Sequence, residues 1–119
     1  MNITSHKGWN KEANGTSLTG YVTIDYDTLV EALGPPVADN DGYKVDAEWH
    51  LTFTEEGGHT LGFVTIYNYK TGRNYLKEDG QDVEDITTWH IGSKSPTPLF
   101  LLQEYFEEND IRGSITLDR

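Results

Sequence analysis

A strict alternation of side-chain type over residues 45–54 constrains the fold more than any other feature of the sequence. The apolar positions are Val45, Ala47, Trp49, Leu51 and Phe53, and the polar positions between them are Asp46, Glu48, His50, Thr52 and Thr54. Successive side chains of a strand point to opposite faces, so this pattern predicts a β-strand with one face in the core. Residues 59–70 follow a glycine-containing turn and have apolar residues at both odd and even positions. Both faces of this strand would then be apolar, which predicts a central strand covered on both sides.

Shorter patterns predict further strands and two helices. Residues 21–25 alternate as a strand, and Asp25 then caps a helix that buries Leu29 and Leu33 and ends at Gly34. The segment ITTWHIG at 86–92 predicts another strand, and Ile115 with Leu117 predicts a short strand at the end of the chain.

The second helix is predicted within the segment TPLFLLQEYFEEND at 97–110. Thr97 would cap it, because Pro98 suits the first helical position. Its buried stripe is Leu99, Leu102 and Phe106. Between the strands, the segment YKTGRNYL at 69–76 is typical of a tight hairpin in which Gly72 takes a positive φ.

Together these elements predict an α+β fold, with an antiparallel β meander of about four to five strands and two helices packed on one face. A chain of 119 residues fits one domain. Residues 1–16 carry little hydrophobic periodicity, so we expect a flexible N-terminal arm there and a single α+β domain over 17–119.

Charge limits the classes of partner. Twenty Asp and Glu residues against nine Lys and Arg residues give a formal net charge of -11. This charge repels phosphate backbones and anionic lipid surfaces, which argues against direct binding of nucleic acid or a membrane. The favoured interpretation of the charge is solubility, and the alternative is attraction to a partner with a basic surface. The chain has no cysteine and no apolar run of signal-peptide or membrane type, so we expect a cytoplasmic protein.

Two Trp-His pairs, Trp49-His50 and Trp89-His90, raise the question of a shared metal or substrate site. If both indoles enter the core, both imidazoles lie on the opposite face, on strands roughly 10 Å apart with the central strand between them. The favoured interpretation is two outward side chains on a solvated face, with no metal, no cofactor and no catalytic residue assigned. The alternative is a small enzyme or ligand-binding domain that uses the polar sheet face around His50, His90 and Tyr67.

The stretch IYNYKTGRNYLK at 66–77 is the most unusual in composition, because it holds three of the nine basic residues beside three tyrosines. The candidate binding residues in it are Tyr67, Tyr69, Lys70, Arg73 and Tyr75. Such residues stack nucleic-acid bases, or anchor protein interfaces, or belong to a half-buried hairpin whose cations neutralise nearby acids. The acidic loop that follows adds Asp82, Glu84 and Asp85 as candidates for contact with a basic groove.

Four segments in one order carry a resemblance: SLTGYVTIDYDTLVEALGPP, YKVDAEWHLTF, VTIYNYKTGRNYL and ITTWHIG, which span residues 17–92. They resemble a family of small, mostly uncharacterised proteins of tailed bacteriophages. The shared pattern is a Gly-Tyr strand, a Tyr-Asp-x-Leu-Val helix, and then Ala-Glu-Trp, Thr-Ile-Tyr-x-Tyr-Lys and Trp-His-Ile-Gly. The resemblance implies a phage origin and a place inside an infected bacterium, and it carries over no catalytic residue.

We therefore expect a small acidic phage-type protein that binds a bacterial host protein and inhibits it without catalysis. A defence enzyme or a nucleic-acid-handling enzyme would offer the basic surface that the charge favours. The sequence leaves open whether the chain also forms a homo-oligomer.

Overall fold

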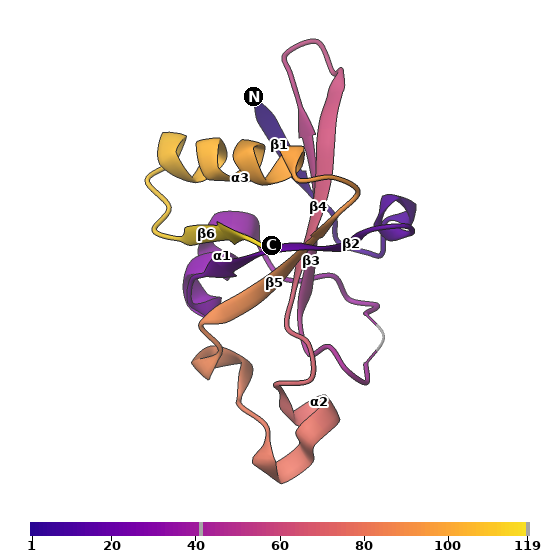
Figure 1. Cartoon of the computed structure of the whole chain (residues 1–119), viewed down its shortest axis with the longest axis vertical. Helices are drawn as coiled ribbons and strands as arrows, with labels where there is room; N and C mark the ends of the chain where they lie inside the picture. Colours follow the sequence, from indigo (N-terminus) through magenta and orange to yellow (C-terminus); the bar gives the residue numbers. More distant parts are fainter. Residues whose placement is uncertain (41, 119) are drawn as a thin grey trace.

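The computed structural model describes residues 1–40 and 42–118; Asp41 and Arg119, both within the predicted domain 17–119, lie outside the described residues. Within these described residues, six strands and three helices follow one another (Figure 1). They are β1 (Asn2–Ser5), β2 (Ser17–Thr23), α1 (Tyr26–Leu33), β3 (Glu48–Thr54), β4 (Thr60–Tyr67), α2 (Arg73–Leu76), β5 (Thr88–Ser93), α3 (Thr97–Glu108) and β6 (Ser114–Leu117). Three short 3₁₀ turns lie at Lys11–Ala13, Lys77–Asp79 and Val83–Asp85.

The strands form one sheet in the order β1-β3-β4-β5-β2-β6, and every neighbouring pair is antiparallel. The predicted α+β class and the meander of β3, β4 and β5 are confirmed. The predicted strand at the end of the chain is β6, which pairs with β2 at one edge. The sheet exceeds the predicted number of strands because β1 pairs with β3 at the other edge.

Helices α1 and α3 cover one face of the sheet, as predicted (Figure 1). The indoles of Trp49 and Trp89 are fully buried on this face, 5.4 Å apart in an edge-to-face contact. Trp49 Nε1 donates to the carbonyl of Gly34 at 2.9 Å, and Trp89 Nε1 donates to that of Ile24 at 3.0 Å. Each buried indole therefore fills the core and also satisfies a backbone carbonyl at one end of α1.

The ends of the two long helices differ in how well they were predicted. Asp25 caps α1, because its Oδ1 accepts from the backbone N–H of Thr28 at 2.7 Å, and Gly34 ends this helix with a φ of 81°. The prediction that Thr97 caps α3 is wrong. The helix begins at Thr97 itself, the residue before it is Pro96, and no side chain caps this end.

Residues 2–5, which lie within the expected flexible N-terminal arm, form β1. Ile3 pairs with Phe53, so the main chain of this segment completes the edge of the sheet beside β3. Residues 6–16 then turn across the sheet face that the helices leave open. There the N–H of His6 donates to the carbonyl of His50 at 2.9 Å.

Candidate functional site

The cross-strand register aligns four side chains on the sheet face opposite the helices. Glu48 of β3 pairs with Tyr67 of β4, Tyr67 pairs with His90 of β5, and His90 pairs with Tyr21 of β2. Directly opposed residues of an antiparallel sheet have Cβ atoms about 4.5–5.5 Å apart, so their side chains touch. This row carries Tyr67 and His90, two of the residues predicted for the polar face.

His90 is the centre of a cluster of aromatic rings. Its imidazole stacks on Tyr67 with ring centroids 5.4 Å apart and an angle of 19° between the planes. Tyr21 lies 5.2 Å away, and Tyr69 meets the imidazole edge-on at 6.0 Å. Within the part of the chain that the structure describes, Nδ1 of His90 is buried and accepts or donates no hydrogen bond.

The aromatic surface continues past Tyr69 through a lysine. Lys70 Nζ lies 5.3 Å from the ring centroid of Tyr69 and 5.4 Å from that of Tyr75. Tyr75 in turn contacts Tyr43 at 5.4 Å, and Lys44 Nζ lies 5.9 Å from the Tyr43 ring. Each such cation–π contact contributes about 0.5–1 kcal/mol at an exposed position.

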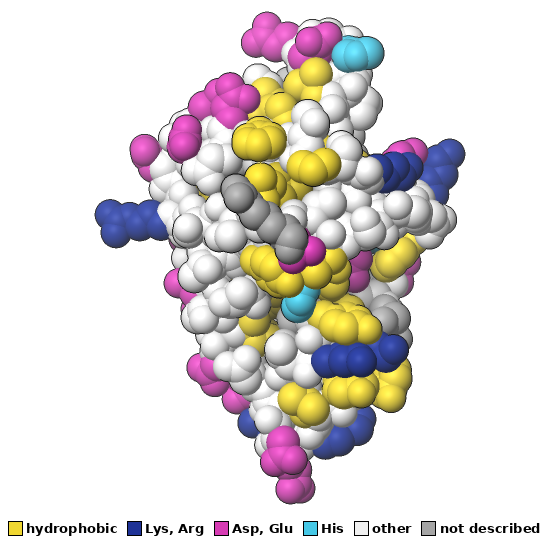
Figure 2. Space-filling model, in the orientation of Figure 1, with side chains coloured by type: hydrophobic (Ala, Val, Ile, Leu, Met, Phe, Trp, Pro, Cys, Tyr) yellow, Lys and Arg dark blue, Asp and Glu magenta, His cyan; other side chains and the backbone are white. Residues whose placement is uncertain are grey.

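We call this continuous surface the tyrosine strip. Its members are Tyr21, Tyr67, His90, Tyr69, Lys70, Tyr75 and Tyr43. Two of its rings are well exposed: Tyr43 at 57% and Tyr69 at 40%. Figure 2 shows a histidine among hydrophobic side chains below the centre of this face, with Lys or Arg side chains beside them.

The loop that carries the strip is not the predicted hairpin. Residues 73–76 form the single-turn helix α2, and Gly72 before it has a φ of −97°. The positive φ values of this loop belong to Lys70 at 58° and Lys77 at 57°. Gly72 is required for a different reason, since a Cβ there would lie 2.0 Å from Oδ1 of Asp46. The loop closes against the chain before β3 instead of pairing with itself.

Asn68 and Asp46 hold this loop in place. Asn68 is fully buried, and its Oδ1 accepts from the backbone N–H groups of Asp46 at 2.8 Å and Ala47 at 3.0 Å. Its Nδ2 donates to Oδ1 of Asp46 at 2.9 Å, while Oδ2 of Asp46 accepts from the N–H of Asn74 at 3.2 Å. These bonds join the chain before β3 to the end of β4 and to α2, so they fix the backbone on both sides of Tyr69 and Lys70.

The prediction that His50 is an outward, solvated side chain is wrong, because His50 is 0% exposed. Residues 6–16 cover it: the N–H of Asn10 donates to Nδ1 of His50 at 3.0 Å, and the Trp9 ring meets the imidazole edge-on at 4.7 Å. Since Nδ1 accepts, Nε2 carries the proton and donates to the Glu48 carboxylate at 2.6 Å. Both ring nitrogens are therefore used to hold the N-terminal segment on the sheet, and neither can take a proton from a substrate.

The two histidines do not converge on one site. His50 pairs with Thr65 and lies in the next row of the sheet from the one that holds His90. Over residues 1–40 and 42–118, no group of three His, Asp or Glu side chains is placed so that it could hold a metal ion. Strand β4 lies between their strands, as the sequence predicted.

Burial shifts the pKa values of the two central groups of the strip. Burial, followed by the nearby charges of Glu48 and the neighbouring tyrosines Tyr69 and Tyr21, raises the pKa of the Tyr67 phenol. Burial lowers the pKa of His90, against the attraction of the Asp118 carboxylate. Both side chains are therefore neutral at physiological pH, and the strip binds through apolar ring surface and neutral polar atoms at this point.

The charged candidates outside the strip lie on α2 and on the loop before β5, and two of them form an ion pair with each other. Arg73 Nε donates to Oδ1 of Asp82 at 2.6 Å, and this ion pair, with Asp85 nearby, raises the pKa of Arg73. Arg73 and Asp82 thus partly neutralise one another. Glu84 and Asp85 remain exposed on the loop before β5.

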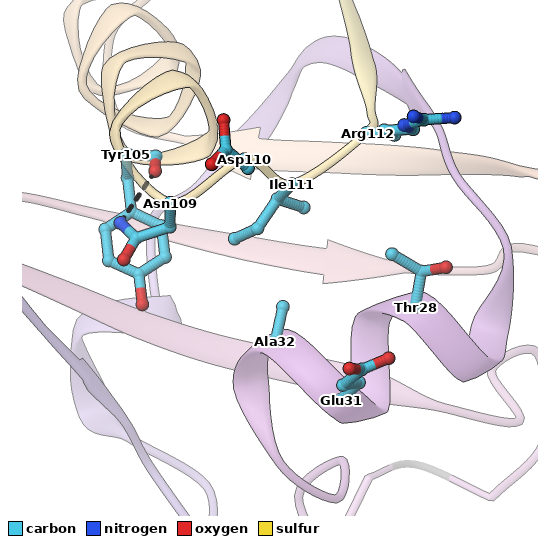
Figure 3. Close-up of a pocket in the computed structure, with 8 residues that line it drawn as sticks. All are labelled: Thr28, Glu31, Ala32, Tyr105, Asn109, Asp110, Ile111 and Arg112. Atoms are coloured by element: carbon cyan, nitrogen blue, oxygen red, sulfur yellow. Dashed lines mark hydrogen bonds between the residues drawn. The ribbon is translucent and has the colours of Figure 1, made fainter.

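A separate pocket of about 430 Å³ lies between α1 and the turn that follows α3 (Figure 3). Ala32 and Ile111 face one another across it, and the Tyr105 ring lies at one end. Glu31 and Arg112 also line it, and the Arg112 side chain points away from its centre (Figure 3). The sequence did not predict this pocket, because its lining comes from two helices far apart in the chain.

The comparisons with protein families, with curated proteins and with solved structures gave no match. No helix among the described residues is both long enough and apolar enough to cross a bilayer.

Proposed function

We propose that this chain is a non-catalytic binding protein that attaches to a bacterial host protein through the tyrosine strip and inhibits it. The single observation that carries this proposal is the continuous ring surface from His90 through Tyr69 and Lys70 to Tyr75. Tyrosine offers a large contact area with few rotatable bonds, and it is enriched among the residues that dominate binding energy at protein interfaces.

The hydrogen bonds beneath the strip support the same function. Asn68 and Asp46 fix the loop before any partner arrives. A surface that is already ordered loses less conformational entropy on binding, so more of the contact energy appears as affinity.

Charge supports a partner with a basic surface. The formal net charge of -11 draws a positively charged protein towards this chain and accelerates its association. In our proposal Glu84 and Asp85 meet basic side chains of the partner, while Tyr69 and Tyr75 enter its apolar pocket. Lys70 stays between the two rings and keeps them apart in the bound state.

The resemblance to small phage proteins supports a bacterial host protein as the target, met in the cytoplasm of the infected cell. Enzymes that handle nucleic acid, including defence enzymes, carry the basic grooves that an acidic protein can occupy. The proposal needs one copy of the chain and makes no use of a homo-oligomer.

A pull-down from bacterial host lysate at low salt tests the proposal. The immobilised proteins are the wild type, the double variant Tyr69→Ala/Tyr75→Ala and the matched control Phe100→Ala, which removes an aromatic ring that is 63% exposed on α3. We expect the wild type and Phe100→Ala to retain the same host protein, and the double variant to lose most of it. Recovery of no host protein, or equal recovery with the double variant, would contradict the proposal.

One observation favours a second candidate, a small ligand-binding or enzymatic role for the polar face. Nδ1 of His90 is buried beside Tyr67 without a hydrogen bond to any described residue, so a ligand would reach it only if the surrounding rings moved apart. His50, the other histidine of that candidate, is already bonded at both nitrogens. The variant His90→Ala discriminates the two functions. It should abolish the binding of a small ligand at this face, whereas protein binding centred on Tyr69 and Tyr75 should only be weakened.

A further inference from the structure

Strand β4 is paired along its whole length on one side and along less than half of it on the other. Strand β3 runs beside it from Glu48 to Thr54. On the other side β5 pairs only with Thr65, Ile66 and Tyr67. No strand in the described part of the chain borders the outer side of residues 60–64, and in Figure 1 the β3–β4 hairpin extends past both β5 and α3.

A groove of about 680 Å³ lies along this open edge. Leu61, Gly62 and Phe63 of β4 line one side, and the other side is lined by Ser95, from the connection between β5 and α3, and by Pro98, in the first turn of α3. The groove therefore begins where β5 leaves the sheet. Its apolar lining includes Leu61, which is 38% exposed.

The chemistry of this edge selects an extended backbone. In an antiparallel strand, alternate residues direct their N–H and C=O groups away from the paired neighbour, so part of residues 60–64 presents hydrogen-bonding groups to the groove. An added strand satisfies these groups in register, and its alternate side chains reach the apolar wall.

Charge at the groove selects among extended peptides. The turn that leads into β4 carries Glu55 and Glu56, both exposed, and the whole chain is strongly acidic. The cation at the groove is Lys94, and its Nζ forms an ion pair with Oε2 of Glu12 at 3.2 Å. A peptide with a basic residue near the turn is therefore complementary, and an acidic peptide is repelled.

We propose that the open edge of β4, residues 60–64, binds an extended peptide segment of a partner protein by strand addition, and that this segment is apolar at alternate positions with Lys or Arg at its ends. The site lies in the other half of β4 from Tyr67. It is a second binding site and does not depend on the tyrosine strip.

The test uses the full chain and three synthetic heptapeptides. The first alternates Val and Thr between two terminal Lys residues, the second is the same peptide N-methylated at alternate amides, and the third has Glu in place of Lys. Binding is measured by NMR titration of the backbone amides. We expect the first peptide to bind at least about tenfold more tightly than either of the others, because they lose backbone pairing or charge complementarity. The largest shifts should fall within residues 60–64.

Two matched protein variants locate the site. Leu61→Lys places a cation in the groove, and Leu76→Lys places one on α2, where the leucine is similarly exposed at 39%. We expect Leu61→Lys to weaken binding of the first peptide by about tenfold and Leu76→Lys to leave it unchanged. Equal affinity for the first peptide and its N-methylated form, absence of binding, or shifts centred on the tyrosine strip would overturn the proposal. So would a dimer in sedimentation that Leu61→Lys dissociates, since the edge would then serve a second copy of this chain.

Discussion

At the scale of single residues, Asn68 determines whether the tyrosine strip is presented in one conformation. Asn68→Ala leaves the backbone N–H groups of Asp46 and Ala47 without their buried acceptor. We expect a loss of about 2–3 kcal/mol in the free energy of unfolding, measured by urea denaturation. The control Asn109→Ala removes an exposed bond to the Tyr105 carbonyl and should cost less than about 1 kcal/mol. Equal costs for the two variants would show that the network beneath the strip contributes little.

The histidines predict how stability depends on pH. Burial and the neighbouring His50 lower the pKa of His6, and burial lowers that of His90. An unfolded histidine titrates near about 6.5, so below that pH the unfolded chain binds more protons than the folded one. The stability contributed by the lowered pKa values is thus present above pH ~6.5 and is lost as the pH falls through the folded-state values.

Urea denaturation between pH ~7.5 and ~5 measures this dependence. The free energy of unfolding should fall with pH in the wild type, and the double variant His6→Gln/His90→Gln should show a shallower slope. His59→Gln, at an exposed position, is the control and should keep the slope of the wild type. A double variant with the wild-type slope would contradict the assignment of the pH dependence to these two residues.

The burial of His50 shows what the sequence could not predict at this scale. Alternation correctly placed His50 opposite Trp49, since parity decides which face a strand side chain occupies. The alternation of residues along a strand does not show which segment covers that face. The cover is Trp9 and Asn10, some 40 positions away in the sequence, and their segment has no periodicity that would reveal it.

At the scale of elements, Gly72 permits the close contact between the strip loop and the chain before β3. Gly72→Ala places a Cβ against the Asp46 carboxylate, whereas Gly8→Ala meets its nearest neighbour, also a carboxylate oxygen, at an ordinary 3.6 Å. We expect Gly72→Ala to lower the free energy of unfolding by about 1–3 kcal/mol and to broaden the amide NMR signals of residues 68–76. Gly8→Ala should change neither. Sharp, unshifted signals in Gly72→Ala would mean that the loop tolerates the added methyl group.

The elements that were predicted correctly are those with local signals. The strand at β3 follows from its alternation, and α1 follows from Asp25, Leu29 and Gly34. The strand β1 was missed because it has one apolar side chain, Ile3, and forms only by pairing with β3. The hairpin predicted at 69–76 was wrong because glycine in a polar stretch suits a turn as well as a close backbone contact, and only the position of Asp46 decides between them.

At the scale of the whole molecule, the two sheet faces have separate tasks. One face is closed by α1 and α3 over the indoles of the core. The other is covered by residues 6–16 over His50 and left open over His90. The tyrosine strip occupies the open part, on a chain whose formal net charge is -11. This division is the basis for assigning partner binding to the strip.

Site-specific photo-crosslinking tests the central claim most directly. The photoreactive residue p-benzoylphenylalanine replaces either Tyr69 or Phe100, which are both exposed aromatic positions on different parts of the molecule. After irradiation in host lysate, the protein with the probe at position 69 should form one predominant adduct with a host protein, and the protein with the probe at position 100 should not. Adducts of equal yield at both positions, or adducts at position 100 alone, would contradict the assignment of the tyrosine strip as the binding surface.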